Sequence, residues 1–144
     1  MTEVLNLDPS YTAKVKGILS QSKLPVEDLD LTTQQFIGIT SDTKLIGIGA
    51  LELYGSSALL RSMAVIYSGQ NKGLGSQLVK ELLNLARLNE VKNLFLLTET
   101  AENFFSKNGF KVVNRADVPQ AILQTEEFTN LCPKTAVCMK LTLD

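Results

Sequence analysis

The sequence has no histidine or tryptophan, only two cysteines, and no excess of either charge. Without histidine, catalytic dyads and triads that use an imidazole base are excluded, together with most zinc sites. The balance of 14 basic and 15 acidic residues argues against a nucleic-acid surface or a polybasic membrane patch. No apolar run approaches the roughly 20 residues of a membrane span, and the N-terminus lacks the pattern of a signal peptide. We therefore expect a cytoplasmic protein, and the length of 144 residues fits one domain, residues 1–144.

The two cysteines, Cys132 and Cys138, lie in a segment whose sequence is typical of an extended chain. Their side chains would point to one face but would lie roughly 20 Å apart, too far to chelate one ion unless the chain bends. We expect buried structural thiols and no metal site.

The spacing of apolar residues predicts an α/β fold with a mixed, mostly antiparallel sheet. Residues 35–40, 44–54 and 58–65 are apolar and separated by short polar turns, which predicts an antiparallel meander. Leucines recur with helical spacing from Leu74 onward, so the strand expected at residues 93–98 should run parallel to the strand before that helix. Further elements are expected at residues 4–7, from Ser10 as a helix cap, at 101–107 with Thr100 as its cap, and at 110–114, 118–129 and 136–143.

Residues 59–76, LLRSMAVIYSGQNKGLGS, have the pattern of an apolar strand, a polar elbow and the start of a helix. Such a turn leaves backbone N–H groups unpaired and pointing one way, so it predicts a phosphate or pyrophosphate site. Gly73 and Gly75 would let the backbone approach the phosphate because neither has a Cβ. The alternative is a glycine-rich turn without a ligand. The residues assigned to the anion are Gln70, Asn71, Lys72, Gly73, Leu74, Gly75 and Ser76.

The hexapeptide QNKGLG, residues 70–75, follows an L-x-x-M-A-V strand and precedes FFSKNGF at residues 104–110. In this setting it resembles the pyrophosphate loop of the GNAT superfamily of acyl-CoA-dependent N-acyltransferases. The resemblance implies a sheet of six or seven strands split between the fourth and fifth, helices on both faces, and acetyl-CoA as cosubstrate. The segment LLTETAENFF, residues 96–105, is similar to the acetyltransferase domain of N-acetylglutamate synthases. Together with LLRSMAV, TEEF and CPKTAVCM it also resembles small arsenic-resistance-associated N-acetyltransferases, which implies an amino-acid-like substrate.

The resemblance also implies which residues hold the cofactor. The end of the strand before the elbow would pair with the pantetheine arm and polarise the thioester carbonyl. The end of the next strand and the short helix after it would contact the acetyl group and the pantetheine. These contacts are assigned to Met63, Ala64, Val65, Thr98, Asn103 and Phe105.

Arg61 is a charge on an otherwise apolar strand, so it needs an anionic partner. Strand alternation places its side chain on one face with Leu59 and Val65. The partner is either a substrate carboxylate, held by a bidentate contact, or an internal carboxylate from Glu52 or Glu99.

Acetyl transfer needs a base that takes a proton from the substrate ammonium. Many members of the resembled family have a glutamate six residues before the valine that ends this strand, and here that position is Leu59. Glu52, in the neighbouring apolar strand, is the remaining candidate base, with solvent exposure or a pair with Arg61 as its alternatives. Tyr67 is the candidate acid, with Tyr54 as its alternative, since Phe105 stands where the family often has a tyrosine.

We expect transfer of an acetyl group from acetyl-CoA to the primary amine of a small metabolite, an amino acid or an amino-acid-like toxicant, by direct attack in a ternary complex. The acceptor would meet Glu99 and Thr100, and in the alternative Thr100 is only a helix cap. The rivals are a protein or peptide N-acetyltransferase, favoured by a groove without an overhang of residues 24–29, and a non-catalytic acyl-CoA sensor. The expected partner is a small-molecule amine, with no nucleic acid and no membrane, and a homodimer is compatible with the sequence.

Overall fold

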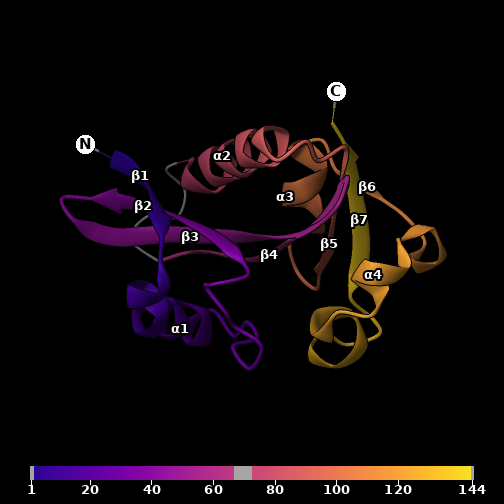
Figure 1. Cartoon of the computed structure of the whole chain (residues 1–144), viewed down its shortest axis with the longest axis horizontal. Coiled ribbons are helices and arrows are strands. Elements are labelled where there is room, and N and C mark those ends of the chain that lie inside the picture. The colour runs from indigo at the N-terminus through magenta and orange to yellow at the C-terminus, as the bar shows by residue number, and fades with distance from the viewer. Residues whose placement is uncertain (1, 67–72, 144) are drawn as a thin grey trace.

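The computed structural model describes residues 2–66 and 73–143 of the chain (Figure 1). Its main elements follow the predicted order. The strands are β1 (Thr2–Leu7), β2 (Gln35–Ser41), β3 (Lys44–Tyr54), β4 (Ser57–Val65), β5 (Asn93–Thr98), β6 (Lys111–Val112) and β7 (Val137–Thr142). The α-helices are α1 (Thr12–Gln21), α2 (Leu74–Leu88), α3 (Glu102–Lys107) and α4 (Gln120–Leu123), and the shorter turns are η1 (Pro9–Tyr11), η3 (Arg115–Asp117) and the π-helical η4 (Glu127–Leu131).

The sheet has seven strands in the order β1-β2-β3-β4-β5-β7-β6. All neighbouring pairs are antiparallel except β4 and β5, which are parallel, so the predicted mixed sheet is confirmed. The hairpin between β2 and β3 turns through Asp42 and Thr43, which both have positive φ, as a two-residue type I′ turn requires. This meander brings β3 and β4 side by side along most of their length.

Helices cover both faces of the sheet (Figure 1). On one face, α2 buries its apolar stripe and packs with α3 against the largest core cluster. The leucines that recur with helical spacing therefore lie on the side of α2 that packs against the sheet. On the other face, α1 and the segment before β2 form a second cluster, and α4 and η4 form a third against β4, β5 and β7.

The parallel strands β4 and β5 are paired over three residues only, from Ser57 with Asn93 to Leu59 with Phe95. Beyond this point the two strands part and a cleft opens between them. The predicted split between the fourth and fifth strands is thus confirmed.

A β-bulge in β4 lies where the strands part. The register passes from Ile48 opposite Ala64 to Ala50 opposite Arg61, and Ser62 adopts a left-handed φ of 56°. The extra residue reverses the alternation of side chains beyond it. Arg61 keeps the face of Leu59, but Val65 packs into the α2 cluster, so the predicted common face of Arg61 and Val65 is wrong.

Several predicted helix starts are also wrong. The α1 helix begins at Thr12, and the cap nearby is Asp8, whose carboxylate accepts from the Ser10 amide and starts η1. Thr100 does not cap α3. Instead the Thr98 hydroxyl accepts a hydrogen bond from the amide of Ala101 at 3.0 Å.

The segment predicted as one helix over residues 118–129 is broken into α4 and η4. Thr125 explains the break, because its hydroxyl donates to the Ile122 carbonyl at 2.7 Å and accepts from the Phe128 amide at 3.4 Å. These side-chain bonds compete with the backbone ladder of a continuous helix. The chain turns there and η4 approaches the cleft.

Candidate active site

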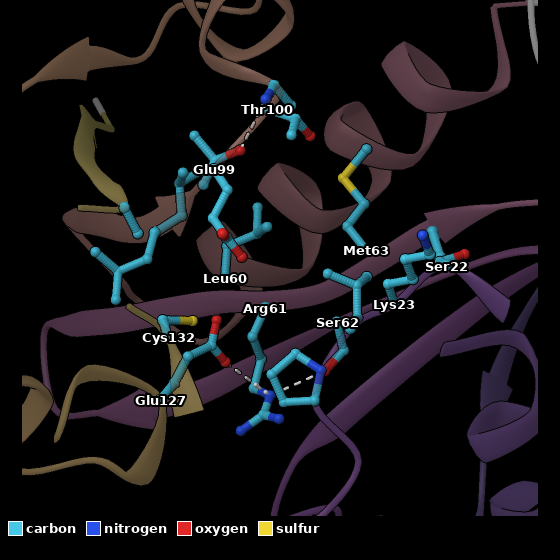
Figure 2. A pocket seen from close by; sticks show the side chains of 18 of the residues that line it. Ser22, Lys23, Leu60, Arg61, Ser62, Met63, Glu99, Thr100, Glu127 and Cys132 are labelled. Carbon is cyan, nitrogen blue, oxygen red and sulfur yellow. Dashed lines mark hydrogen bonds and ion pairs between the residues drawn. The ribbon is translucent and has the colours of Figure 1, made fainter. Parts of the chain in front are cut away.

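The cleft between β4 and β5 has a volume of about 1080 Å³ (Figure 2). One wall is the end of β4 from Leu60 to Val65, and the opposite wall is formed by β5 and the start of α3. Residues 22–25 and Glu27 form an overhang, and η4 closes the far side. The parting of two parallel strands therefore creates a cavity that both apolar and charged side chains line.

Six of the thirteen residues predicted to contact a cofactor line this cleft. Thr98 and Phe105 contribute to one wall, and the end of β4 contributes to the other. Gly73 and Ser76 lie near the start of α2, and Asn103 lies on α3, but these three do not line the cleft. Leu74 is buried in the core, so only its backbone is available to a ligand. The cofactor candidates that line the cleft are Met63, Ala64, Val65, Gly75, Thr98 and Phe105.

Four of the predicted site residues lie outside the described residues: Tyr67, Gln70, Asn71 and Lys72. Their proposed roles as acid and as pyrophosphate loop stay predictions.

The structure favours glycine at residues 73 and 75 for two different reasons. Gly73 is the N-cap of α2 with φ 75°, a left-handed conformation that glycine adopts without strain, and it makes no side-chain cap. A Cβ on Gly75 would lie 3.1 Å from the ring of Phe104. The missing Cβ at Gly75 therefore accommodates the packing of α3 on α2, in addition to the close approach of a phosphate that the sequence indicated.

Arg61 lies at the centre of a buried ion cluster. Its side chain is 0% exposed and contacts three carboxylates from separate segments. Asp28 binds it in a bidentate manner, with Nη2 to Oδ1 at 2.6 Å and Nη1 to Oδ2. Nη1 also donates to Oε1 of Glu52 at 2.7 Å, and Nε lies 3.4 Å from Oε2 of Glu127. Burial disfavours the charge, but the bonds to Asp28 and the neighbouring carboxylates raise the pKa of Arg61 above its ordinary value.

Glu52 is bonded on both carboxylate oxygens. Oε1 accepts from Arg61 and, at 3.3 Å, from Gln34, and Oε2 accepts from the Tyr54 hydroxyl at 2.6 Å. Burial and this bond raise the pKa of Tyr54. Of the alternatives left open by the sequence, the structure shows the internal pair of Arg61 with Glu52. Glu52 is not among the described residues that line the cleft.

Glu127 is a site residue that the sequence did not single out. It begins η4, its side chain is 7% exposed, and it lines the cleft beside Arg61 (Figure 2). Burial raises the pKa of Glu127 to about 7, against the opposing effect of Arg61. The only signal in the sequence was the TEEF segment, which carried a resemblance but no periodicity that would place this side chain.

Cys132 lies next to Glu127 in the cleft, and Figure 2 shows its sulfur beside the carboxylate. Burial, followed by the charge of Glu127 and the hydrogen bond between the two side chains, raises the pKa of Cys132 to about 12. The thiol is therefore neutral at pH 7. Cys138 is buried in the core, as predicted, whereas Cys132 is only half-buried.

Glu99 and Thr100 follow β5 and line the cleft as exposed side chains. The charge of Glu99 contributes to the raised pKa of Cys132, so these two residues face the same region. Glu99 is not among the described ion-pair partners of Arg61.

Within residues 2–66 and 73–143, no three acidic or cysteine side chains are grouped to hold a metal ion. The helices in these same ranges include none that is long and apolar enough to cross a membrane.

Comparison with known proteins gives consistent matches. Residues 32–112 match the family model of the acetyltransferase (GNAT) domain. An uncharacterized N-acetyltransferase of Chlorobaculum tepidum is 30% identical over 122 residues, covering 84% of this chain and 76% of the relative. The [citrate [pro-3S]-lyase] ligase of Escherichia coli is 28% identical over 140 residues, which are 96% of this chain but only 37% of the ligase.

Among solved structures, the N-acetylglutamate synthase of Neisseria gonorrhoeae in complex with coenzyme A and L-arginine superposes with a TM-score of 0.83 at 16% identity. The match covers 99% of this chain and 33% of the synthase. This chain thus spans about a third of the length of the ligase and of the synthase, and the likeness to the synthase shows the fold.

Proposed function

This chain belongs to the GNAT acetyltransferase family, and we propose that it transfers an acetyl group from acetyl-CoA to the primary amine of a small metabolite. The observation that carries the proposal is the cleft between β4 and β5, which runs from the start of α2 to a buried carboxylate on η4. One cavity thus offers a place for an anionic donor at one end and for a proton acceptor at the other.

The donor half of the cleft fits an acyl-CoA. Among the described residues no side chain caps the start of α2, so its first amides would be available to a pyrophosphate, and Gly75 of this turn lines the cleft. The bulge at Ser62 follows the last residue pair of β4 with β5, and the parted β4 edge would accompany a pantetheine arm as an added strand would. When bound, acetyl-CoA supplies the activated acetyl group. The gonococcal synthase was solved with coenzyme A, which supports this assignment.

The acceptor half favours a small molecule over a protein segment. Residues 22–25 and Glu27 overhang the cleft, and Asp28 ties this overhang to Arg61 through its bidentate contact. A protein acceptor would need an open groove at this position. We therefore retain an amino acid or an amino-acid-like toxicant as the proposed acceptor class.

Arg61 is a weaker candidate for a substrate carboxylate than the sequence suggested. Its Nη atoms donate to Asp28 and Glu52, so a substrate carboxylate would have to displace one of them. We propose that Arg61 chiefly organises the overhang, and that Glu99 and Thr100, which are exposed in the cleft, contact the acceptor.

Direct attack of the amine is supported by the state of Cys132. This cleft thiol has a pKa of about 12, so very little thiolate is present at neutral pH. A thiol in this state is a poor nucleophile, and a route through an acetylated cysteine is disfavoured. The amine and the thioester would then react within one ternary complex.

The experiment is a free-CoA release screen with acetyl-CoA and a panel of L-amino acids, arsenic-bearing amino acids and simple primary amines such as 2-phenylethylamine. We expect amine-dependent release together with formation of the N-acetyl product, measured by mass spectrometry. Binding of acetyl-CoA, measured by calorimetry, is a separate readout. Binding without release for any amine would overturn the enzyme assignment and favour an acyl-CoA sensor.

A further inference from the structure

We propose that Glu127 is the general base of this acetyl transfer and takes the ammonium proton of the acceptor inside the cleft. The inference rests on the proposed function. Glu127 starts the π-helical turn η4, a type of local distortion that is frequent at functional sites. The same turn also directs Asn130 and Leu131 to the cleft, so η4 as a whole forms the wall that an acceptor would meet.

Glu127 differs from the other carboxylates of the ion cluster in its position, because it lines the cleft. Asp28 uses both oxygens on Arg61, and Glu52 uses its two oxygens on Arg61, Gln34 and Tyr54. Neither lines the cleft in the described part of the chain. Glu127 contacts Arg61 through the longer Nε distance of 3.4 Å and does line the cleft. Among the described carboxylates of the cluster, Glu127 is thus the one that an acceptor can reach.

Glu127 is more deeply buried than the other carboxylates that line the cleft. Glu27 and Glu99 also line the cleft, but both side chains are more exposed, and Glu27 accepts a hydrogen bond from the Val26 amide. The Glu127 side chain is 7% exposed. Its carboxylate is therefore largely shielded from water and lies next to Arg61 of β4, with a small exposed fraction through which a proton can leave.

The charges around Glu127 suit this role. Burial favours its protonated form, the guanidinium of Arg61 opposes this, and the carboxylates of Asp28 and Glu52 reinforce it, while the Cys132 thiol donates to the carboxylate. The resulting pKa of about 7 lies near working pH, where a carboxyl group can both accept and release a proton. Burial and the neighbouring charges of Arg61, Asp28 and Glu52 together make the Glu127 carboxylate a suitable proton acceptor.

The proton and electron balance is complete. The Glu127 carboxylate takes a proton from the acceptor ammonium, R–NH₃⁺, and leaves a neutral amine. The nitrogen lone pair then forms the C–N bond to the thioester carbonyl carbon, and the C–S bond breaks with its electron pair on sulfur. The surplus proton on nitrogen passes to the CoA thiolate, and protonated Glu127 releases its proton to solvent.

The test compares Glu127→Gln with two matched variants. Glu126→Gln changes the adjacent, exposed glutamate of the same segment, and Glu52→Gln changes the carboxylate that the sequence favoured. Each protein is assayed by free-CoA release with acetyl-CoA and the fastest amine of the panel, across about pH 5.5 to about 9 to span the range of a base near neutrality. Calorimetry with acetyl-CoA and circular dichroism check binding and folding.

For the wild type we expect kcat to rise with pH through an inflection near 7. Glu127→Gln should lower kcat by about 100-fold or more and remove the inflection, with acetyl-CoA affinity unchanged. Glu126→Gln should stay within about twofold of the wild type, because its side chain faces solvent.

An active Glu127→Gln that keeps the wild-type inflection would overturn this inference and leave the proposed function intact. Loss of both rate and inflection in Glu52→Gln alone would likewise overturn it and assign the base to Glu52. A wild type that binds acetyl-CoA but acetylates no amine would overturn both proposals.

Discussion

The Nε of Arg61 lies 3.4 Å from Oε2 of Glu127, and this contact joins a buried ion cluster to the wall of the cleft. The cluster gathers charges from the segment before β2, from β3, from β4 and from η4. A single described cation, the Arg61 guanidinium, offsets the charge of three surrounding carboxylates, so the cluster carries an excess of negative charge. Stability and proton chemistry are therefore coupled at the same residues.

Arg61→Gln should be strongly destabilising. Removal of the cation leaves the carboxylates of Asp28, Glu52 and Glu127 close together with little solvent, at a cost of about 3–5 kcal/mol in the free energy of unfolding. Urea denaturation at pH 7.5 measures the loss. Arg87→Gln, at the exposed end of α2, is the control and should cost no more than about 0.5 kcal/mol. A loss below about 1 kcal/mol for Arg61→Gln would contradict a role of Arg61 in neutralising the cluster.

Glu127→Gln should stabilise the protein in a pH-dependent way. Burial raises the pKa of Glu127 from 4.5 to about 7, so the native state holds a proton that the unfolded state has released between these values. Stability of the wild type is therefore lost as pH rises through this window, relative to a variant that cannot titrate. The difference in unfolding free energy between variant and wild type should grow from pH 4.5 to pH 8 by at most about 3 kcal/mol.

Urea titrations of wild type and Glu127→Gln at several pH values measure this difference. Glu126→Gln supplies the control, because an exposed side chain should give a difference that does not change over the same range. A flat difference for Glu127→Gln would show that the carboxyl titrates at its ordinary value.

Gly73→Glu should weaken acetyl-CoA binding by about tenfold or more, which corresponds to about 1.4 kcal/mol. A carboxylate at the start of α2 would repel the pyrophosphate proposed to bind there. Gly73→Asn is the matched control, because asparagine tolerates the left-handed φ of 75° and adds no charge. A Cβ at this position meets no atom of the described residues within 4 Å. Equal calorimetric affinities for Glu and Asn at residue 73 would contradict the pyrophosphate assignment.

Glu127→Gln should also make Cys132 more reactive. The charge of Glu127 and its hydrogen bond both raise the pKa of the thiol, so their removal increases the thiolate fraction at a given pH. Mass spectrometry of iodoacetamide labelling at about pH 8 measures the rate at each cysteine. Cys138, in the buried core, is the internal control and should label at an unchanged slow rate. If Cys132 labels no faster in the variant, the two side chains do not interact in solution.

The elements that the sequence predicted well are those with a local pattern. The meander of β2, β3 and β4 follows from apolar runs with short turns, and α2 follows from its leucine period. The parallel direction of β5 then follows from the helical crossover. These features depend on residues that are close in the chain.

The features that the sequence did not predict depend on contacts between distant residues. Ser62 carries no glycine signal for its left-handed φ, and the bulge is visible only in its pairing with β3. Asp28 and Arg61 are far apart in the chain and meet only after folding. Glu127 belongs to a pair of adjacent glutamates, and only the turn at Thr125 decides which of them is buried.

The strands β4 and β5 are joined by three residue pairs, so the two halves of the sheet share little backbone hydrogen bonding. One half contains β1 to β4, and the other contains β5, β7 and β6. Because α2 connects β4 to β5 and its leucines pack in a core cluster with residues of both halves, side chains supply the cohesion that the interrupted ladder lacks. Amide hydrogen exchange should therefore be slowest where α2 packs across the boundary between β4 and β5. A pulling force that separates these two strands would be resisted mainly by the packing of the helix.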